Sequence, residues 1–452
     1  MIRASERRQL AFDIALLWLA KWAIGAYVLH AGFTHVSDDD YARVVIAQTF
    51  AHAPTLDPSG TSWLPFPFWL TGGAMTLFGS RSLDTARAIA FTLGVASVAL
   101  PYGAMRALRC GRATALGAVT LAMATPWSAW LGVATVPEAM TACLIAAGAM
   151  AAAAGSRATQ VGGAACLLVA ALSRYEAWPA CAVFAVAAVV RTRTLRGGES
   201  SPTGLGRGAA WLAFVLAILG PLAWMAWNAH AHGSPFHFLA RVAAYRQAIG
   251  AASAPLAEKV VAFPCAVATT APVIVGLTAL GSIALFVDAE VRARWSWPLA
   301  SAIAILAFLV YGDIRDGAPT HHPERAVLPI LWILAPFAAD SLRALAGRVA
   351  WARPAREMWV VGASVAGALA WGVTLPARLR AHPASAEDES REAQIARGEA
   401  LRADPRIARL TVTPCAYEHF ALIAAFAAPE RVDIAPCTHT VVTPSCPEVD
   451  PR

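Results

Sequence analysis

The stretch Thr34-His-Val-Ser-Asp-Asp-Asp-Tyr-Ala-Arg43 follows a long apolar segment over roughly 10–33. It carries three consecutive carboxylates, Asp38, Asp39 and Asp40. Acidic side chains at the end of a membrane span are costly unless they serve a site. A solvated acidic turn that merely ends the span is the other interpretation of the same residues. The remaining loops on that side of the membrane decide between the two.

The composition of the chain is that of a membrane protein. Of its 452 residues, 58% are hydrophobic and only 14% are charged, whereas a soluble domain carries about 25% charged residues. Apolar runs of roughly 17–25 residues, long enough to cross a bilayer, recur along most of the chain. The sequence therefore predicts an all-α polytopic membrane protein. Its first span is too long for a signal-peptide core, so we expect it to be retained.

The basic residues indicate an orientation in the membrane. The net charge of +7 comes mostly from arginines scattered in short loops, a pattern that orients a membrane protein and is not typical of nucleic-acid binding. Arg3, Arg7 and Arg8 predict a cytoplasmic N-terminus, which puts the aspartate triplet on the outer side. We expect about 11 transmembrane helices. They are predicted at roughly 10–33, 85–107, 113–130, 138–155, 160–173, 176–190, 209–229, 261–287, 297–311, 326–342 and 357–376.

The orientation leaves a long first outer loop, 34–83. Two apolar stretches in it, 41–52 and 63–78, are predicted to be juxtamembrane helices that lie in the interface, because the second is short and begins with Pro65 and Pro67. Loops of this length are more often functional than passive.

Two regions are predicted along the chain. Residues 1–376 form the transmembrane domain, and 377–452 form a soluble C-terminal segment. A flexible linker is expected at roughly 383–395. The pattern over 407–434 predicts strand, helix and strand, hence a small α/β periplasmic appendage if the outer side of this inner-membrane protein is a bacterial periplasm.

The eight cysteines divide in the same way. Five lie in or beside spans and are expected to act as small apolar side chains: Cys110, Cys143, Cys166, Cys181 and Cys265. Cys415, Cys437 and Cys446 lie in the polar tail, where a disulfide, if one forms, is expected between Cys437 and Cys446. No C-x-x-C spacing is present, so a metal site is not predicted.

Unusual polar residues collect in the predicted outer loops. Glu138 opens a span, and Ser173-Arg-Tyr-Glu-Ala-Trp178 is a short connection with both charges. Each has an ordinary alternative: a carboxylate is favoured at any helix N-terminus, Arg174 can simply pair with Glu176, and histidines are common at interfaces. Convergence from at least five loops indicates a cavity at the membrane surface instead. The candidate substrate-binding residues are Arg43, Arg174, Glu176, Asn228, His321, His322 and Arg325.

This combination suits chemistry on a lipid-linked anionic substrate. A guanidinium can donate two hydrogen bonds to a phosphate at once. A carboxylate within reach of a hydroxyl can act as a general base, and cations around a departing phosphate stabilise the charge that develops on it. The residues thus predict transfer of a group from a lipid phosphate to an acceptor hydroxyl.

The motifs resemble those of the GT-C superfamily, the polytopic membrane glycosyltransferases that use polyprenyl-phosphate sugars, such as dolichyl-phosphate-mannose mannosyltransferases, protein O-mannosyltransferases and aminoarabinose transferases. Ser37-Asp-Asp-Asp-Tyr-Ala-Arg43 matches the acidic motif after span one, and Trp63-Leu-Pro-Phe-Pro67 resembles the Pro-rich start of the second juxtamembrane helix. Phe78-Gly-Ser-Arg-Ser-Leu-Asp-Thr-Ala-Arg87 resembles the segment leading into span two, and the Arg174 to Glu176 turn is similar to a family motif.

The resemblance implies an inverting transfer without a cofactor beyond the lipid-linked sugar donor. Asp39, or failing it Asp38 or Asp40, would take the proton from the acceptor hydroxyl, and Glu138 would orient the acceptor or the base. Arg174, His322 and Arg325 would hold the departing polyprenyl phosphate. The acceptor stays open between protein, lipid and glycan, and a divalent metal is possible but not indicated. At the Pro-rich motif the family often has a basic residue, whereas this chain has Trp63 and Leu64.

Two other functions remain open. A transporter or flippase of a lipid-linked sugar or small solute would need charged residues within its spans, and Lys21 is the main one here. A non-catalytic scaffold subunit would have no use for the clustered polar loops.

Overall fold

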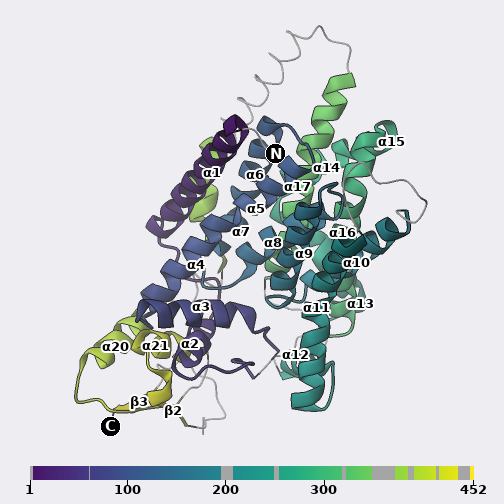
Figure 1. The fold of residues 1–452 in the computed structure, drawn as a ribbon. Coiled ribbons are helices and arrows are strands. Elements are labelled where there is room, and N and C mark those ends of the chain that lie inside the picture. The colour runs from purple at the N-terminus through teal and green to yellow at the C-terminus, as the bar shows by residue number, and fades with distance from the viewer. Residues whose placement is uncertain are drawn as a thin grey trace.

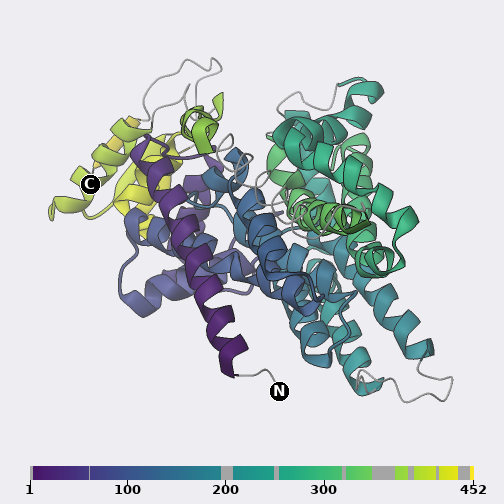
Figure 2. The same ribbon diagram turned by 90° about the horizontal axis from the view of Figure 1, so that it is seen from above.

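The computed structural model describes residues 4–60, 62–194, 207–248, 254–317, 322–348, 372–384, 391–413, 417–435 and 448–451. Helices run between the two ends of an elongated bundle (Figure 1). The bundle helices are α1 (Ala4–His30), α4 (Leu83–Ser97), α5 (Ala99–Ala107), α6 (Arg112–Met123), α7 (Pro126–Leu131), α8 (Glu138–Ala151), α9 (Arg157–Ala171), α10 (Ala177–Thr194), α11 (Arg207–His232), α13 (Leu256–Thr270), α14 (Pro272–Gly281), α15 (Ile283–Val287), α16 (Ala289–Ile314) and α17 (Pro323–Arg348). From above, α1 lies on an outer face beside the C-terminal segment, and α10 to α16 gather on the other side (Figure 2).

The apolar helices confirm a multi-pass membrane protein. Five stretches are long and apolar enough to cross a bilayer, and a bent pair makes up to six. The five are Ser5–His30, Leu83–Ala107, Gly208–His232, Ala289–Ile314 and Pro323–Arg348. Every predicted span except 357–376, which lies mostly outside the described residues, coincides with one or more helices. Several of these helices are short, so the total of eleven crossings stays a prediction.

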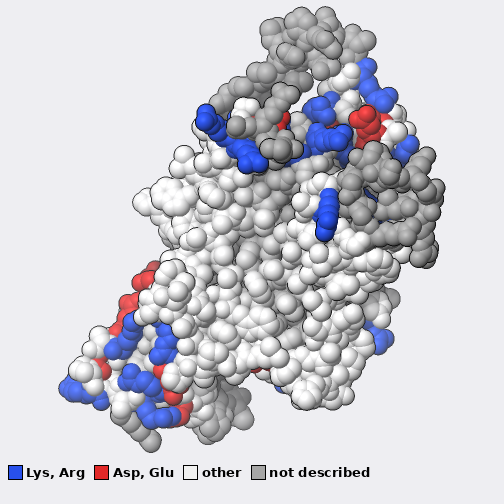
Figure 3. Space-filling view, in the orientation of Figure 1, with Lys and Arg blue, Asp and Glu red and all other residues white. Residues whose placement is uncertain are grey.

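The surface between the two ends suits lipid. On the face shown in Figure 3, Lys, Arg, Asp and Glu gather at both ends, and the broad middle is nearly free of them. Helix α1 exposes Phe12, Leu19 and Trp22 there, while Leu17 and Val28 are buried against the bundle. Apolar side chains that face outward over such an area mark a membrane surface.

Two of the predicted spans are broken. Between α13 and α14 the chain bends by 94°, and α6 ends before α7 begins. Pro272 and Pro126 occupy the first positions of α14 and α7. A proline pushes the preceding residue out of the helical region, and the backbones of Ala271 and Thr125 are accordingly not helical. The predicted spans over 261–287 and 113–130 are therefore interrupted helices.

Helix α8 forms the centre of the bundle together with α17. Almost every side chain of α8 is buried, and most are small. An added Cβ at Gly148 would lie 2.4 Å from Leu167, and one at Gly163 would lie 2.2 Å from the Cβ of Ala151. These glycines let α8 and α9 approach backbone to backbone, a common means of packing helices in a membrane.

Ion pairs inside the bundle are structural. Asp13 of α1 accepts hydrogen bonds from Arg112 and, at 2.5 Å, from the hydroxyl of Tyr102. Lys21 donates to the carbonyl of Ser128 at 2.6 Å. Lys21, which the sequence singled out as the main charge within the spans, therefore holds α7 against α1.

The loop 34–83, predicted to be the first outer loop, contains two short helices as expected, α2 (Asp39–His52) and α3 (Phe66–Phe78), at one end of the bundle (Figure 1). We call this end, which carries the aspartate triplet, the site end. Neither helix is long enough to span a bilayer. They pack closely, since an added Cβ at Gly72 would lie 2.6 Å from the carbonyl of Ala47. Leu77 and Phe78 are exposed at the end of α3, as expected for a helix in the interface.

The C-terminal segment packs onto α2. It contains α20 (Glu392–Ala403), β1 (Leu410–Thr413), α21 (His419–Phe426), η3 (Pro429–Arg431), β2 (Val432–Ile434) and β3 (Glu448–Pro451). The sheet has the order β2-β1-β3, with β1 parallel to β2 and antiparallel to β3. Gln48 of α2 donates to the carbonyls of Arg81 and Ala424, both at 2.8 Å. The linker expected over 383–395 is shorter than predicted, because α20 already begins at Glu392.

The described cysteines are free, and the tail cysteines cannot be placed. Cys110, Cys143 and Cys181 are buried, Cys166 is half-buried, and Cys265 is exposed on the apolar surface. The predicted Cys437–Cys446 pair and Cys415 lie outside the described residues.

Candidate functional site

The aspartate triplet lies at the start of α2. Asp38 is the residue before the first turn, and Asp39 and Asp40 belong to that turn. Carboxylates are favoured there because the N-terminus of a helix carries partial positive charge. Successive side chains of a helix point about 100° apart, so the three carboxylates meet three different environments.

Asp38 is paired with the C-terminal segment. Its carboxylate accepts hydrogen bonds from Nε and Nη2 of Arg391 at 2.8 and 2.9 Å. This two-pronged ion pair is mostly buried and leaves Asp38 little freedom to accept a proton from a substrate.

Asp40 is buried and holds the backbone together. Its Oδ2 accepts from the amides of Val36 and Ser37, and its Oδ1 accepts from the amide of Thr135 at 3.1 Å. The hydroxyl of Thr135 returns a hydrogen bond to the Asp40 carbonyl at 2.8 Å. Burial raises the pKa of Asp40 to about 6, against the lowering effect of Arg325 and the three amides. Asp40 thus fixes α2 to the segment before α8.

Asp39 is the accessible carboxylate of the triplet. Its side chain is 44% exposed, and Nη1 of Arg325 donates to its Oδ2 at 3.3 Å. A single long hydrogen bond to a cation keeps a carboxylate oriented while leaving lone pairs for another donor.

A chain of buried charges stands behind Asp39. Oε1 of Glu138 accepts from Nε and Nη2 of Arg325 at 2.9 and 2.6 Å. The same oxygen accepts from Nη1 of Arg174 at 2.5 Å, and Arg174 also forks onto Glu176. Burial lowers the pKa of Arg174, but Glu138 and Glu176 outweigh it and raise the pKa above the usual value. These contacts bring together residues from the ends of α8, α9 and α17.

The local sequence explains how these side chains reach one place. Glu138 follows Pro137 at the first turn of α8. Arg174 lies in the tight turn between α9 and α10, and Arg325 lies in the first turn of α17 after Pro323. Three connections at the same end of the bundle therefore deliver one charge each.

Arg43 is the cation of the site with unused donors. It is buried next to the ring of Trp63, with 4.4 Å from its Cζ to the ring centroid, and next to Phe68 at 5.8 Å. Its Nε and Nη1 have no hydrogen-bond partner in the described part of the chain. Burial lowers the pKa of Arg43 to about 10, against Glu138 and Asp39, so it remains charged at neutral pH.

A small cavity adjoins Arg43. It measures about 20 Å³ and is lined by residues of α2, α3 and α4, and by Thr135. That volume holds about one water or one oxygen of a ligand. The sequence showed no basic residue at the Pro-rich motif, and the structure places the Arg43 guanidinium over Trp63 instead.

Asn228, His321 and His322 are the remaining predicted site residues. The amide of Asn228 donates to the carbonyl of Trp224 within α11 at 2.9 Å and is buried. His322 has a left-handed backbone with φ 53° and packs against Trp127 before α17. His321 lies outside the described residues. Asn228 thus acts as a helix residue here, whereas His322 flanks the turn that carries Arg325.

Sequence reasoning missed Tyr175 and Ser37. The ring of Tyr175 stacks on Phe238 of α12 (His237–Ala248) with centroids 4.4 Å apart. Its hydroxyl donates to the carbonyl of Ser62 at 2.9 Å and accepts from Nε1 of Trp224 at 3.1 Å. Ser37 accepts from Arg325 at 3.2 Å. Tyr175 lies inside the Arg174 to Glu176 motif, which was the available signal.

A second group of ion pairs joins the helices beyond α12. Nη1 of Arg246 contacts Asp313 at 2.6 Å, and Nζ of Lys259 contacts Asp316 at 2.7 Å. These pairs tie α12 and α13 to the end of α16. Within the described residues, no group of three His, Cys, Asp or Glu could hold a metal ion.

This bundle, with two short helices after the first helix and a charged cluster at that end, has the fold of solved structures of ArnT and of an archaeal oligosaccharyltransferase. No family model and no curated protein matches the chain by sequence. Among solved structures, ArnT from Cupriavidus metallidurans bound to undecaprenyl phosphate superimposes with a TM-score of 0.55 and 15% identity, over 93% of this chain and 88% of that one.

Structures of archaeal oligosaccharyltransferases are similar to this chain to the same extent. The Archaeoglobus fulgidus oligosaccharyltransferase tethered with an acceptor peptide superimposes with a TM-score of 0.56 at 13% identity, over 94% of this chain. The match covers 63% of that longer chain. AglB from the same organism, in complex with an inhibitory peptide and a dolichol-phosphate, gives a TM-score of 0.50. Identities this low establish the fold alone.

Proposed function

We propose that the protein is an integral membrane glycosyltransferase that moves a sugar from a polyprenyl-phosphate donor to an acceptor hydroxyl. The observation that carries the proposal is Asp39, a half-exposed carboxylate beside Arg325, in a cluster that also contains Arg43 with unused donors. Transfer from a phosphate requires a base to take the proton of the acceptor, and a nearby cation with unused hydrogen-bond donors to stabilise the leaving phosphate. The structures of ArnT with undecaprenyl phosphate and of AglB with a dolichol-phosphate support the lipid carrier.

The reaction follows from these positions. Asp39 accepts the proton of the acceptor hydroxyl, whose oxygen forms a bond to C1 of the sugar. The bond between C1 and the phosphate oxygen breaks, and its electron pair leaves with the polyprenyl phosphate. Attack opposite to the leaving group inverts the configuration at C1. Arg43 donates hydrogen bonds to the phosphate as its negative charge grows.

The buried charges position this apparatus. Glu138 is shared by Arg174 and Arg325, so it holds Arg325 against Asp39 and does not itself act as a base. Arg174 is saturated by Glu138 and Glu176, and we assign it a positioning role instead of a contact with phosphate. Arg43, whose Nε and Nη1 have no partner in the described part of the chain, supplies positive charge to the leaving phosphate, so no cofactor besides the donor is part of the proposal. A divalent ion would add to that charge, and activity measured with and without a chelator tests for one.

The site faces the outside of the inner membrane in this proposal. The N-terminus of α1 and the arginines at the opposite end of the bundle would then be cytoplasmic, and the C-terminal segment periplasmic. The carrier is a polyprenyl-phosphate sugar, and the acceptor is a protein, lipid or glycan.

The decisive experiment uses purified protein and a short-chain polyprenyl-phosphate hexose labelled in the sugar. Wild-type protein is expected to release label from the lipid, and Asp39→Asn is expected to lower kcat about 10²–10⁴-fold, the usual contribution of a general base. Asp84→Asn is the matched control, because the Asp84 side chain is 83% exposed near the same end of the bundle. Equal turnover in Asp39→Asn would reject Asp39 as the base. Label retained by wild type with every donor would favour transport of the lipid-linked sugar.

A further inference from the structure

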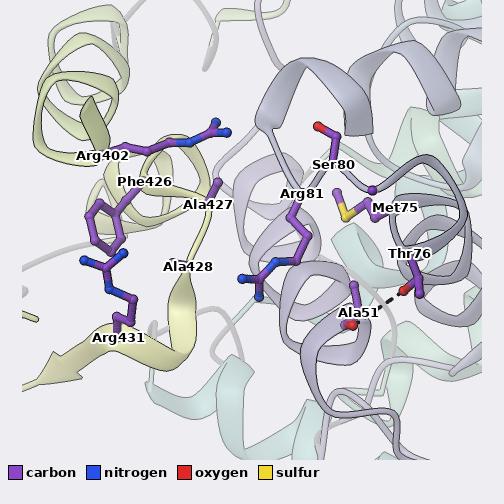
Figure 4. Close-up of a pocket in the computed structure, with 11 residues that line it drawn as sticks. Ala51, Met75, Thr76, Ser80, Arg81, Arg402, Phe426, Ala427, Ala428 and Arg431 are labelled. Atoms are coloured by element: carbon purple, nitrogen blue, oxygen red, sulfur yellow. Dashed lines mark hydrogen bonds between the residues drawn. The ribbon is translucent and has the colours of Figure 1, made fainter. Parts of the chain in front are cut away.

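A cavity of about 580 Å³ opens where α2 and α3 meet the C-terminal segment (Figure 4). One side is lined by Ala51 of α2 and by residues from Met75 to Arg81; the other is lined by Arg402 of α20 and by residues from Phe426 to Arg431. We call it the arginine cavity. It is separate from the Asp39 cluster, since Ala51 lies roughly 18 Å along α2 from Asp39 at 1.5 Å per residue.

Three arginines line the arginine cavity, Arg81 from the turn after α3, and Arg402 and Arg431 from the C-terminal segment. In Figure 4, Arg81 and Arg402 extend toward the space between the two sides, whereas the guanidinium of Arg431 lies against the ring of Phe426. Arg81 is paired with Glu430 through two hydrogen bonds of 2.9 Å. Arg431 donates to the carbonyl of Ala408 at 2.7 Å and lies over the ring of Phe426. Arg81 is thus neutralised by Glu430, and Arg431 is held by the backbone of the C-terminal segment.

Arg402 is the cation that is not committed to the fold. It is exposed, and no hydrogen bond or ion pair joins it to the residues that the structure describes. By contrast, Arg406 and Arg409 nearby are each paired with an aspartate. A solvated arginine at the rim of a concave site is placed to bind an anion.

The lining also selects the kind of anion. Guanidiniums that approach from separate directions suit the tetrahedral oxygens of a phosphate, whereas a planar carboxylate is satisfied by a single fork. Met75 and Phe426 are buried beneath them and offer an apolar floor.

We propose that the arginine cavity binds a phosphomonoester carried by the acceptor. This inference rests on the proposed function, because it assigns the cavity to the substrate that Asp39 deprotonates. The acceptor then spans from its phosphate in the arginine cavity to its hydroxyl at Asp39, along α2. The phosphate is borne either by a lipid headgroup, whose apolar part contacts Met75 and Phe426, or by a soluble sugar phosphate.

The binding test uses full-length protein in neutral phosphatidylcholine nanodiscs and isothermal titration calorimetry. The probes are dihexanoyl phosphatidic acid for the lipid source and glucose 6-phosphate for the soluble source. Arg402→Gln is expected to weaken binding of the preferred probe about tenfold, as loss of a charge-assisted contact does. Arg406→Gln, which removes the same charge from an arginine outside the cavity, is expected to bind like wild type. A preference for one probe identifies the source.

Absence of saturable binding by both probes would overturn the inference, and so would equal weakening in Arg402→Gln and Arg406→Gln. Asp39→Asn separates this test from the proposed function, since that variant is expected to bind the probe normally while failing to transfer sugar. Where the acceptor is known, Arg402→Gln is expected to raise its KM about tenfold and to leave kcat unchanged. A fall in kcat with unchanged KM would instead assign Arg402 to the fold of the segment and reject the site.

Discussion

Nη2 of Arg325 lies 2.6 Å from Oε1 of Glu138, although 187 positions separate the two residues. Both are buried, and the second hydrogen bond, from Nε of Arg325, is 2.9 Å long. The pair joins the N-terminal turns of α8 and α17, the two central helices of the bundle. Because Arg325 also contacts Asp39, the arrangement at the centre of the bundle determines where the proposed base stands.

Removing one partner of this pair is expected to be costly. Glu138→Gln leaves Arg174 and Arg325 buried without their shared carboxylate, and Arg325→Gln leaves Glu138 with Arg174 alone. Breaking a buried ion pair in this way destabilises by about 3–5 kcal/mol. The double variant is expected to lose less free energy of unfolding than the two single variants together. With both residues replaced, neither Glu138 nor Arg325 remains as a buried charge without its partner. Thermal unfolding of the detergent-solubilised protein, followed by tryptophan fluorescence, measures this, and strictly additive losses would show that the two residues act independently.

Arg43 is predicted to bind the donor phosphate. Arg43→Gln should weaken binding of a fluorescent polyprenyl phosphate by roughly tenfold or more, since a charge-assisted hydrogen bond is lost. Arg43→Lys is expected to restore only part of the affinity, because an ammonium lacks the planar fork that stacks on Trp63. Arg241→Gln, an exposed arginine of α12, serves as the control. Unchanged affinity in Arg43→Gln would remove Arg43 from the site.

Asp40 predicts a pH dependence of stability. Its folded pKa is raised to about 6 from the ordinary 3.8, so between these values the folded protein binds more protons than the unfolded chain. Its contribution to stability is therefore present at pH 4 and is lost as the pH rises through 6, by up to about 3 kcal/mol. Asp40→Asn should lack this pH-dependent contribution to stability. The difference between the unfolding midpoints at pH 4.5 and pH 7 should therefore be smaller in the variant than in wild type. A pH profile that is identical in the variant and in wild type would contradict the raised pKa, and Asp84→Asn controls for the loss of an exposed carboxylate.

The pair between Asp38 and Arg391 is predicted to dock the C-terminal segment. Arg391→Asp places two carboxylates together and should expose the segment to limited proteolysis, while transfer slows because the start of α2 is no longer held. The double variant Asp38→Arg with Arg391→Asp should recover much of the resistance to proteolysis and of the transfer rate, since the two charges again attract. Arg409→Asp, at an exposed pair within the segment, is the control. A segment that stays protected in the single variant would mean that Gln48 and Arg81 suffice to hold it.

Several features of the site were predictable from the residues, and others were not. The triplet, Glu138, the Arg174 turn and Arg325 all stand next to apolar runs, so their place at one end of the bundle followed from the topology. The different surroundings of Asp38, Asp39 and Asp40 did not follow, because they depend on Arg391, Arg325 and Thr135, which are distant in sequence. The broken spans at Pro126 and Pro272 had a local signal, since a proline within a predicted helix disfavours helical backbone before it.

The sequence by itself determined that this chain is a helical membrane protein, with the resemblance to membrane glycosyltransferases carried by its loops. Apolar runs of span length and short polar connections suffice for that, because the bilayer requires each spanning segment to satisfy its own backbone hydrogen bonds. Only the tertiary structure decided which aspartate stays accessible, that Arg43 lies over Trp63 with unused donors, and that Arg81, Arg402 and Arg431 line one cavity. These are contacts between segments up to some 350 positions apart, and their geometry depends on how the helices pack, a property that no local pattern encodes.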